Sequence, residues 1–314
     1  MTSISKVNIG LIGFGNWGRK YFETLENIPK ANLKYIYTNN KKNFLNNPNL
    51  IFTNDYDDIF SDPDINAVII VTPQETHYKI AKKALLAGKN ILLEKPMSST
   101  TKECLDLINI AKKMSKTITV GHIYIHNPSI ISIKKTIKEG KIGQIKYIYA
   151  ERTGISKNMT STGAMWELAP HDIYIINYLL NDSPFVKYAE GSYTDNVCDN
   201  VYISLNYQRN INVSIRVSRI DPNKSRKMII VGTCGSIVFD ELREDKIKRF
   251  NKEGILQPYK NEKNHQTPLF LQCISFINSI ENTLKPIVTG EDGSENVRVL
   301  EKIQKHMEES KIIN

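Results

Sequence analysis

The chain has 314 residues, 40% of them hydrophobic and 24% charged, so it is long enough for two domains and has the composition of a globular protein, not a disordered one. Its formal net charge is +9, but the lysines are spread along the whole chain without interleaved aromatic residues, which argues against nucleic-acid binding. No stretch approaches the ~20 apolar residues of a membrane span and no signal-peptide pattern is present, so we expect a cytoplasmic protein.

The four cysteines, at positions 104, 198, 234 and 273, lie far apart in the sequence. They form no CxxC pair and have no histidine at the spacing of metal ligands. We therefore expect reduced thiols and no metal site.

Up to about Val120, short β-branched runs alternate with helical patterns. This alternation predicts a doubly wound parallel sheet with crossover helices. The expected strands are Val7–Ile12, Leu33–Tyr37, Leu50–Phe52, Ala67–Val71, Asn90–Leu93 and Thr117–Val120. Clear helices are expected over Thr76–Ala87 and over Thr100–Met114, the latter capped by Ser99 or Thr100. A first domain is accordingly expected over residues 1–122.

The first expected strand leads into the segment Gly13-Phe14-Gly15-Asn16-Trp17-Gly18, and a helix is expected to start near Trp17. Glycines at this spacing permit a tight turn, a close approach of a pyrophosphate to the backbone, and close packing of helix on strand. The N-terminus of the following helix favours phosphate binding. These six residues are therefore expected to bind NAD or NADP.

The end of the second strand normally carries an acidic residue that binds the adenine ribose of NAD. Here Thr38 stands at about that position and no acid follows it closely. Lys41 or Lys42 could meet the 2′-phosphate of NADP, or both could be simply solvated. The sequence leaves the choice between the two cofactors open.

Two further strands run directly into polar segments. Ala67–Val71 is followed by Thr72-Pro73 and by His77, and Asn90–Leu93 is followed by Glu94-Lys95-Pro96. Because ligands bind at the carboxyl ends of the strands in open α/β sheets, these residues are expected at the cofactor edge. His77 could line the nicotinamide pocket or serve only in capping and packing.

After Gly121 the pattern changes, with longer strands that follow one another directly. They are expected at Ile145–Arg152, Val186–Tyr193, Val201–Gln208, Ile211–Val217, Met228–Val231 and Ser236–Asp240, as neighbours in an open, mainly antiparallel sheet. One helix is expected at about Glu167–Leu180 and a final one at about Asp292–Ser310. This predicts an α+β domain over residues 123–290 and a C-terminal helix, 291–314, packing back on the first domain.

Together these features resemble the Gfo/Idh/MocA oxidoreductase family. The resemblance rests on the glycine loop, Thr72-Pro73 with His77, Glu94-Lys95-Pro96, Gly121-His122 with Asn127-Pro128, and Gly290-Glu291-Asp292-Gly293. It runs from Val7 to about Leu180 and resumes at Gly290. It implies an α/β protein with a Rossmann domain and an open-sheet substrate domain, which interconverts a secondary hydroxyl and a ketone on a sugar.

The resemblance also implies the catalytic residues. In such proteins the lysine of the Glu-Lys-Pro motif, here Lys95, bonds the reacting oxygen, and the histidine of an Asp-x-x-x-His motif, here His171, exchanges its proton. Glu167 occupies the aspartate position, and a spacing of four residues puts it on the same helix face as His171. Imidazole, with a pKa of about 6.5, suits proton removal, and Lys95 suits stabilisation of the alkoxide. Glutamate reaches about one methylene further than aspartate, so its exact role stays open.

The form Gly-His, Asn-Pro and Leu-Ala-Pro-His-Asp looks most like the nucleotide-sugar subgroup, such as the UDP-N-acetylglucosamine or UDP-N-acetylglucosaminuronate 3-dehydrogenases. His122 is then expected at the cofactor, and Tyr124 and Asn127 at the sugar or nicotinamide. The alternatives are a keto-sugar reductase of deoxysugar synthesis, a free sugar or inositol dehydrogenase, and a non-catalytic dinucleotide-binding regulator, against which Lys95 and His171 argue. A homodimer or homotetramer is expected because open-faced sheets of this kind pair across subunits.

Overall fold

A computed structural model describes residues 6–40, 49–156, 162–259, 266–281 and 284–312. The chain forms two compact units, one made of residues 1–123 and 266–297 and the other of residues 124–265 and 298–314. These bounds differ from the expected domains, because residues 266–289 belong to the first unit and the chain beyond residue 297 belongs to the second. The core contacts described below give the physical reason.

The first unit contains a six-stranded parallel sheet in the order β3-β2-β1-β4-β5-β6. The strands are β1 Val7–Ile12, β2 Ala31–Tyr37, β3 Ile51–Thr53, β4 Ala67–Ile70, β5 Asn90–Leu93 and β6 Ile118–Val120. The six expected strands and the doubly wound arrangement are thereby confirmed. The strand order reverses between β1 and β4, which is where open α/β sheets bind ligands at their carboxyl edge.

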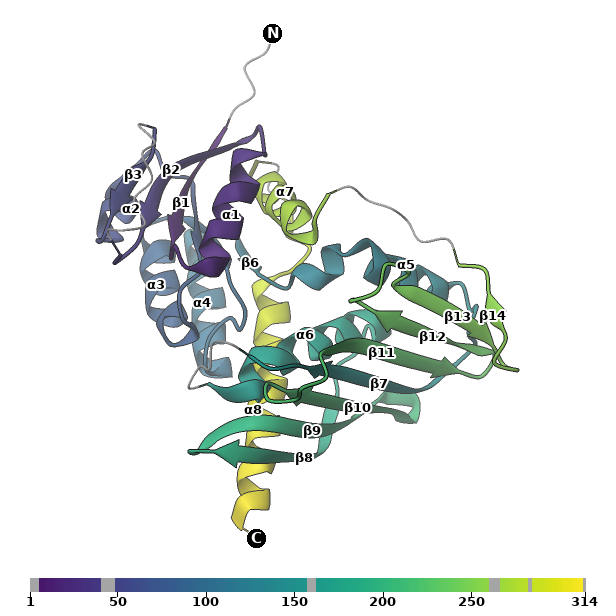
Figure 1. The fold of residues 1–314 in the computed structure, drawn as a ribbon. Coiled ribbons are helices and arrows are strands. Elements are labelled where there is room, and N and C mark those ends of the chain that lie inside the picture. The colour runs from purple at the N-terminus through teal and green to yellow at the C-terminus, as the bar shows by residue number, and fades with distance from the viewer. Residues whose placement is uncertain (1–5, 41–48, 157–161, 260–265, 282–283, 313–314) are drawn as a thin grey trace. The chain divides into compact units, whose positions relative to one another are not determined.

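Helices lie on both faces of this sheet (Figure 1). They are α1 Asn16–Glu26, α2 Asp57–Ser61, α3 Gln74–Leu86, α4 Thr101–Met114 and α7 Pro268–Glu281. The hydroxyl of Thr100 accepts a hydrogen bond from the backbone N–H of Glu103, which confirms Thr100 as the N-cap of α4. Helix α7 was not predicted. Its side chains Leu269, Cys273 and Phe276 join the core around β1 and α1, and this burial assigns the segment to the first unit.

The second unit contains an eight-stranded sheet in the order β14-β13-β12-β11-β7-β10-β9-β8. The strands are β7 Ile145–Thr153, β8 Phe185–Thr194, β9 Val197–Tyr207, β10 Ile211–Ser218, β11 Ser225–Gly232, β12 Gly235–Asp240, β13 Ile247–Asn251 and β14 Leu256–Gln257. Strands β7 and β10 run parallel and all other neighbours run antiparallel. The sheet is therefore mixed and mainly antiparallel, with one parallel pair among the strands expected to be antiparallel.

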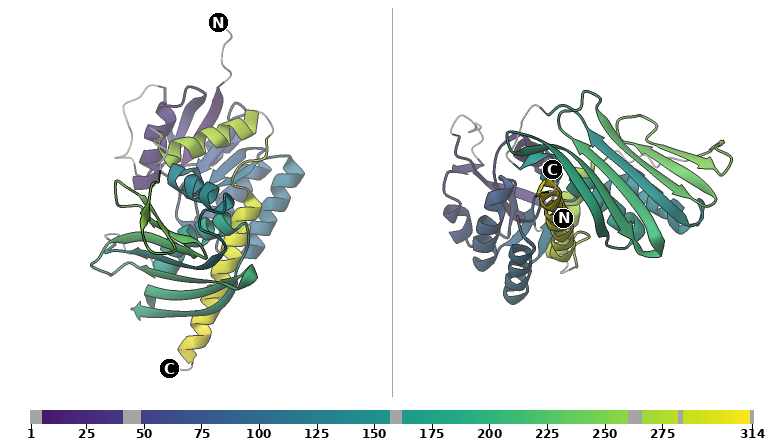
Figure 2. Two further views of the ribbon diagram at one scale, coloured as in Figure 1. Left: turned by 90° about the vertical axis from the view of Figure 1, so that its right-hand side faces the viewer. Right: turned by 90° about the horizontal axis from the view of Figure 1, so that it is seen from below.

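One face of this sheet is covered by helices α5 Pro128–Lys138 and α6 Gly163–Leu180 (Figure 2). Alternate strand residues, such as Ile148 and Ala150 on β7, face the same core as α6. Helix α8, Gly290–Ile312, begins in the first unit, but its residues Val299, Leu300, Ile303 and Met307 pack in the core of the second unit. The part of the final helix after Val297 therefore belongs to the second unit, and its packing on the Rossmann domain stays a prediction.

Candidate functional site

Gly13 and Gly15, in the loop between β1 and α1, and Gly18, in the first turn of α1, are not all glycine for the same physical reason. Gly13 has φ +105°, and a Cβ there would lie 2.5 Å from the carbonyl oxygen of Val71. A Cβ on Gly18 would lie 2.1 Å from the carbonyl oxygen of Gly13. The fold itself therefore requires glycine at both positions.

Gly15 is free of such constraints. It precedes α1 with an ordinary φ of −81°, and nothing lies within 4 Å of the place where its Cβ would be. The first turn of α1 has no side-chain cap and no acidic residue, so its backbone N–H groups and positive end face this open space. A space that a Cβ would partly fill, in front of a helix N-terminus, fits the pyrophosphate of a dinucleotide.

The side chains of this loop divide between the protein core and the solvent. Phe14 is buried, and the guanidinium of Arg19 lies 4.7 Å from the centroid of its ring. Asn16 is exposed beside Gly15. Trp17 donates its indole N–H to the carboxylate of Glu94, 2.6 Å away. Asn16 and the backbone of this segment are thus the groups of the loop that are open to a cofactor.

Thr38 lies at the carboxyl end of β2, where the ribose-binding residue was expected. It is buried, and its hydroxyl accepts a hydrogen bond from the backbone N–H of Asn40. Lys41 and Lys42 lie outside the described residues, so the structure does not bear on a 2′-phosphate contact.

His77 joins the loops that follow β4 and β5. It lies in the first turn of α3 and is 1% exposed, with Nδ1 2.8 Å from the carbonyl oxygen of Pro96 and Nε2 2.8 Å from that of Thr72. Burial lowers the pKa of this imidazole. Of the two roles left open for His77, these contacts support the packing role, because both ring nitrogens face backbone carbonyl oxygens and the neutral ring can donate its one N–H to either.

Glu94 and Lys95 follow β5 directly, at the carboxyl edge of the parallel sheet. The Glu94 carboxylate accepts hydrogen bonds from Trp17 Nε1, from Tyr21 Oη at 2.7 Å and from the backbone N–H of Lys95 at 3.1 Å. Glu94 is 7% exposed. Lys95 is half-buried and precedes a cis peptide bond to Pro96. The motif is thereby attached to the helix that follows the glycine loop.

His122 follows β6, the strand beside β5, and is 2% exposed. Burial, together with the charge of the nearby Lys95 ammonium, lowers the pKa of His122 to about 3. Its imidazole is therefore neutral near pH 7 and can lie beside Lys95 without a second positive charge. The first unit thus brings together the glycine loop, Thr72, His77, Glu94, Lys95 and His122 at one edge of the sheet.

The remaining expected residues, Tyr124, Asn127, Glu167 and His171, belong to the second unit. Glu167 and His171 lie four residues apart on the continuous helix α6 and are both partly exposed. The rings of Tyr124 and His171 meet edge to face, with their centroids 5.2 Å apart. Asn127 caps α5, since its side-chain oxygen accepts from the backbone N–H of Ser129 at 2.9 Å. The Asn-Pro pair thus has a local structural reason as a helix start.

The hydroxyl of Tyr124 belongs to a buried charge cluster that the sequence analysis missed. Arg152 on β7 holds Asp172 through two hydrogen bonds, of 2.7 and 3.0 Å. Its third nitrogen donates to Tyr124 Oη at 2.9 Å, and Tyr124 in turn donates to Glu241 at 3.0 Å. Burial raises the pKa of Tyr124 to about 12, so the phenol stays protonated.

A signal for this cluster was present in the strand pattern. Residues 148, 150 and 152 share one face of β7, and Ile148 and Ala150 point into the core. An arginine at the third of these positions must be buried, and a buried guanidinium requires an acidic partner. Asp172, which directly follows His171, is that partner and links the cluster to α6.

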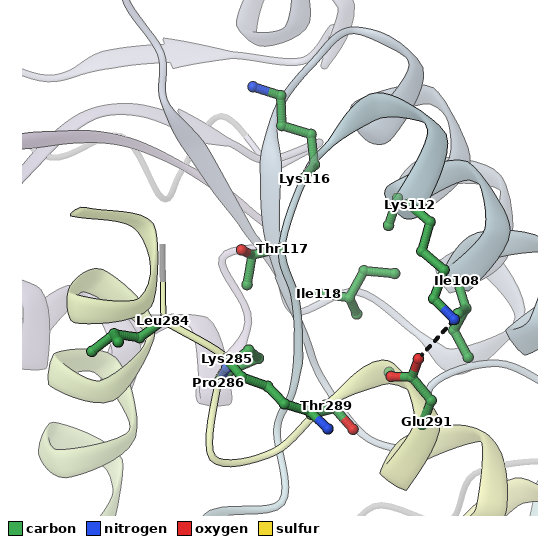
Figure 3. Close-up of a pocket in the computed structure, with 12 residues that line it drawn as sticks. Ile108, Lys112, Lys116, Thr117, Ile118, Leu284, Lys285, Pro286, Thr289 and Glu291 are labelled. Atoms are coloured by element: carbon green, nitrogen blue, oxygen red, sulfur yellow. Dashed lines mark ion pairs between the residues drawn. The ribbon is translucent and has the colours of Figure 1, made fainter. Parts of the chain in front are cut away.

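A cavity of about 340 Å³ in the first unit lies elsewhere (Figure 3). It is lined by the last turns of α4, by residues 116–118 and by residues 284–291, at the amino end of β6. Lys112 and Glu291 form an ion pair of 3.1 Å in its wall. Because Lys95 and His122 lie at the carboxyl edge of the sheet, this cavity is separate from the expected site residues.

The described residues contain neither a metal-binding cluster nor a membrane-spanning helix. In that part of the chain, no group of three or more His, Cys, Asp or Glu side chains is arranged to hold a metal ion. Each described helix is either too short or too polar to cross a bilayer.

Comparison with known proteins matches both halves of the chain to one family. Residues 7–122 match a model described as an oxidoreductase family with an NAD-binding Rossmann fold, and residues 134–314 match the C-terminal alpha/beta domain of the same family. An uncharacterized oxidoreductase, YrbE of Bacillus subtilis, is 24% identical over 324 residues, covering 95% of this chain and 93% of the relative.

Two further relatives carry a named activity. The inositol 2-dehydrogenase/D-chiro-inositol 3-dehydrogenase of Lactiplantibacillus plantarum is 30% identical over 189 residues, which is 58% of this chain and 53% of that protein. The solved structure of UDP-N-acetylglucosamine 3-dehydrogenase from Acidithiobacillus ferrooxidans has a TM-score of 0.83 at 21% identity, covering 96% of this chain and 98% of that one. At this identity the likeness to the solved structure establishes the fold.

Proposed function

Because the chain belongs to the Gfo/Idh/MocA family of NAD(P)-dependent oxidoreductases, we propose that it interconverts a secondary hydroxyl and a ketone on a sugar. The observation that supports this most is the position of Lys95. It follows β5 at the carboxyl edge of the parallel sheet, and the Glu94 carboxylate links its backbone to Trp17 in the first turn of α1, directly after the glycine loop. An ammonium group held at a cofactor edge can bind the oxygen of a reacting carbinol.

In the oxidation direction, Lys95 donates a hydrogen bond to the substrate hydroxyl and stabilises the alkoxide as it forms. His171 accepts the hydroxyl proton, and Glu167, one turn earlier on α6, binds a neighbouring sugar hydroxyl. When bound, the nicotinamide supplies the acceptor for the hydride that leaves the same carbon. In the reduction direction His171 returns the proton to the oxygen.

For the substrate we propose a nucleotide-linked sugar of the kind that 3-dehydrogenases oxidise. The support is the Leu168-Ala169-Pro170-His171-Asp172 segment, the shared fold with a UDP-N-acetylglucosamine 3-dehydrogenase, and the net charge of +9, which attracts anionic substrates. The second candidate is inositol or a free sugar, because a relative at 30% identity is an inositol dehydrogenase.

The test is turnover with NAD and NADP against a panel of UDP-N-acetylglucosamine, UDP-N-acetylglucosaminuronate, myo-inositol and glucose. Lys95→Met and His171→Asn should each lower kcat by about 10²- to 10⁴-fold while NADH binding, measured by fluorescence, is retained. Lys116→Met, at the other edge of the same sheet, is the matched control and should behave as wild type. Near-normal turnover in both site variants contradicts the mechanism.

We also propose that the protein forms a homodimer or homotetramer through the sheet face opposite α6. Tyr188 and Tyr202 lie exposed on the neighbouring strands β8 and β9 of this face, and Tyr147 lies exposed on β7, on the other side of β10. Exposed aromatic residues gathered on one face are typical of protein interfaces. Light scattering after size exclusion should give a multiple of 35.9 kDa, and Tyr202→Glu should reduce the assembly. A monomer in the wild type excludes this proposal.

A further inference from the structure

We propose that Glu94 is a positioning residue whose buried carboxylate connects the backbone of Lys95 by hydrogen bonds to helix α1 and, through Tyr21, to helix α7. In this role its carboxylate acts through Lys95 and Trp17 and does not itself need to touch the cofactor. The assignment of catalysis to Lys95 rests on the proposed function, whereas the coupling of Glu94 to Trp17 does not depend on it.

The first support is the use of both carboxylate oxygens by protein donors. Oε1 accepts from Trp17 Nε1 at 2.6 Å and from Tyr21 Oη at 2.7 Å, and Oε2 accepts from the backbone N–H of Lys95 at 3.1 Å. Short hydrogen bonds to an ionised carboxylate are the strong ones. One side chain therefore connects two positions of α1, Trp17 and Tyr21, to the backbone of Lys95.

The second support is a layer behind Glu94 that no ligand can reach. Tyr21 and Gln272 are both 0% exposed, and Gln272 on α7 donates from Nε2 to Tyr21 Oη at 2.8 Å. Burial, with the negative charge of Glu94, raises the pKa of Tyr21 well above its usual value. Tyr21 therefore stays a donor, and a chain of hydrogen bonds runs from α7 through Tyr21 and Glu94 to the Lys95 backbone.

The third support is the space beside Glu94 that Gly121, the residue directly after β6, leaves open. A Cβ at Gly121 would lie 3.0 Å from both the carboxyl carbon and Oε1 of Glu94. Gly121 has no positive φ that would explain a glycine, so the room it leaves for the carboxylate is the local reason for the missing side chain. Glu94 is thus enclosed by α1 and the end of β6, with α7 behind Tyr21.

This arrangement has a kinetic consequence. The backbone N–H of Lys95 donates to the Glu94 carboxylate. A change that lets this carboxylate move therefore also displaces the Lys95 ammonium group from its reacting position. A displacement of about 1 Å can lower a rate by about 10²-fold without weakening ligand binding. Because Tyr21 cannot touch any ligand, a change at Tyr21 that alters catalysis must act through its neighbours. Its hydroxyl bonds Glu94, and its ring packs edge to face on Trp17, a contact that phenylalanine at position 21 keeps.

The experiment compares Tyr21→Phe with Tyr78→Phe. Tyr78 Oη also donates to a carboxylate at 2.7 Å, that of Asp106, in the same unit and away from the site. In a Trp166→Phe background, which leaves Trp17 as the single tryptophan of the chain, Tyr21→Phe should shift the Trp17 emission. It should also lower kcat by about tenfold or more and change the Kd of NADH by less than about threefold. Tyr78→Phe should neither shift the Trp17 emission nor lower kcat.

Gly121→Ala provides an independent variant that keeps every hydrogen-bonding group and displaces the carboxylate sterically. It should reproduce both the emission shift and the fall in kcat. If Tyr21→Phe and Gly121→Ala match Tyr78→Phe in emission and kcat, the proposal is wrong. It is also wrong if Glu94→Gln weakens NADH binding by tenfold or more while Tyr21→Phe leaves emission and kcat unchanged, because Glu94 is then a direct cofactor ligand. Absence of turnover with every sugar refutes the proposed function. The Trp17 emission of the same variants then still shows whether Glu94 is coupled to Trp17.

Discussion

The buried ion pair of Arg152 and Asp172 offers the sharpest test of how buried charges contribute to the stability of the second unit. The two side chains are 4% and 5% exposed and share two hydrogen bonds, so Arg152→Met leaves Asp172 as a buried, uncompensated carboxylate. Removing one partner of such a pair costs about 3–5 kcal/mol of unfolding free energy. At about 2–4 °C per kcal/mol for a domain of this size, Tm should fall by about 6–20 °C.

A double-mutant cycle separates the lost pairing from the cost of the stranded charge. Arg152→Met with Asp172→Leu removes both charges and should recover about 2 kcal/mol or more relative to the sum of the single variants. The assay is urea unfolding followed by circular dichroism. Arg216→Met is the control, because its pair with Asp221 is 27% and 14% exposed and should cost only about 1 kcal/mol or less. A loss below about 1 kcal/mol for Arg152→Met, or an additive cycle, refutes this reasoning.

Three further predictions follow from single residues. Gly15→Ala should weaken NADH binding, measured by fluorescence, with little change in Tm, because its Cβ meets no protein atom within 4 Å. Gly18→Ala should lower Tm, measured by calorimetry, since its Cβ would lie 2.1 Å from a backbone oxygen; an unchanged Tm contradicts the packing argument. Burial lowers the pKa of His126 to about 4, so the unfolded chain binds more protons between about pH 6.5 and pH 4, and stability falls as the pH decreases through that window. His126→Gln should remove up to about 1.4 kcal/mol of this dependence per pH unit in urea titrations, and an unaltered pH profile would show that His126 titrates normally.

Much of the fold could be predicted from the sequence because its signals are local. The β-branched runs and the Gly13, Gly15 and Gly18 spacing depend on backbone preferences within a few residues, and the six strands of the parallel sheet appear where they were expected. Thr100 as a cap and the helix that carries Glu167 and His171 follow from the same short-range rules. The family resemblance carried by Glu94-Lys95-Pro96 is likewise a contiguous motif, and the family match confirms it.

Long-range contacts decided the rest. Helix α7 has no motif that marks it as part of the first unit, and burial of Phe276 and Leu269 in the core around β1 assigns it there. Gln272 and Tyr21 are 251 positions apart, yet they meet behind Glu94. Patterns within a few residues of sequence do not predict contacts between residues so far apart in the chain.

By itself, the sequence determined the dinucleotide loop, the alternating first half, the strand-rich second half and the identity of the candidate catalytic residues. Only the tertiary structure decided which neighbours those residues have: the carbonyls that hold His77, the donors that fix Glu94, and the Arg152 cluster beside His171. The physical reason is that secondary structure and glycine conformations depend on neighbours along the chain. The pairing of buried polar groups depends instead on which distant side chains the folded core brings within hydrogen-bonding distance.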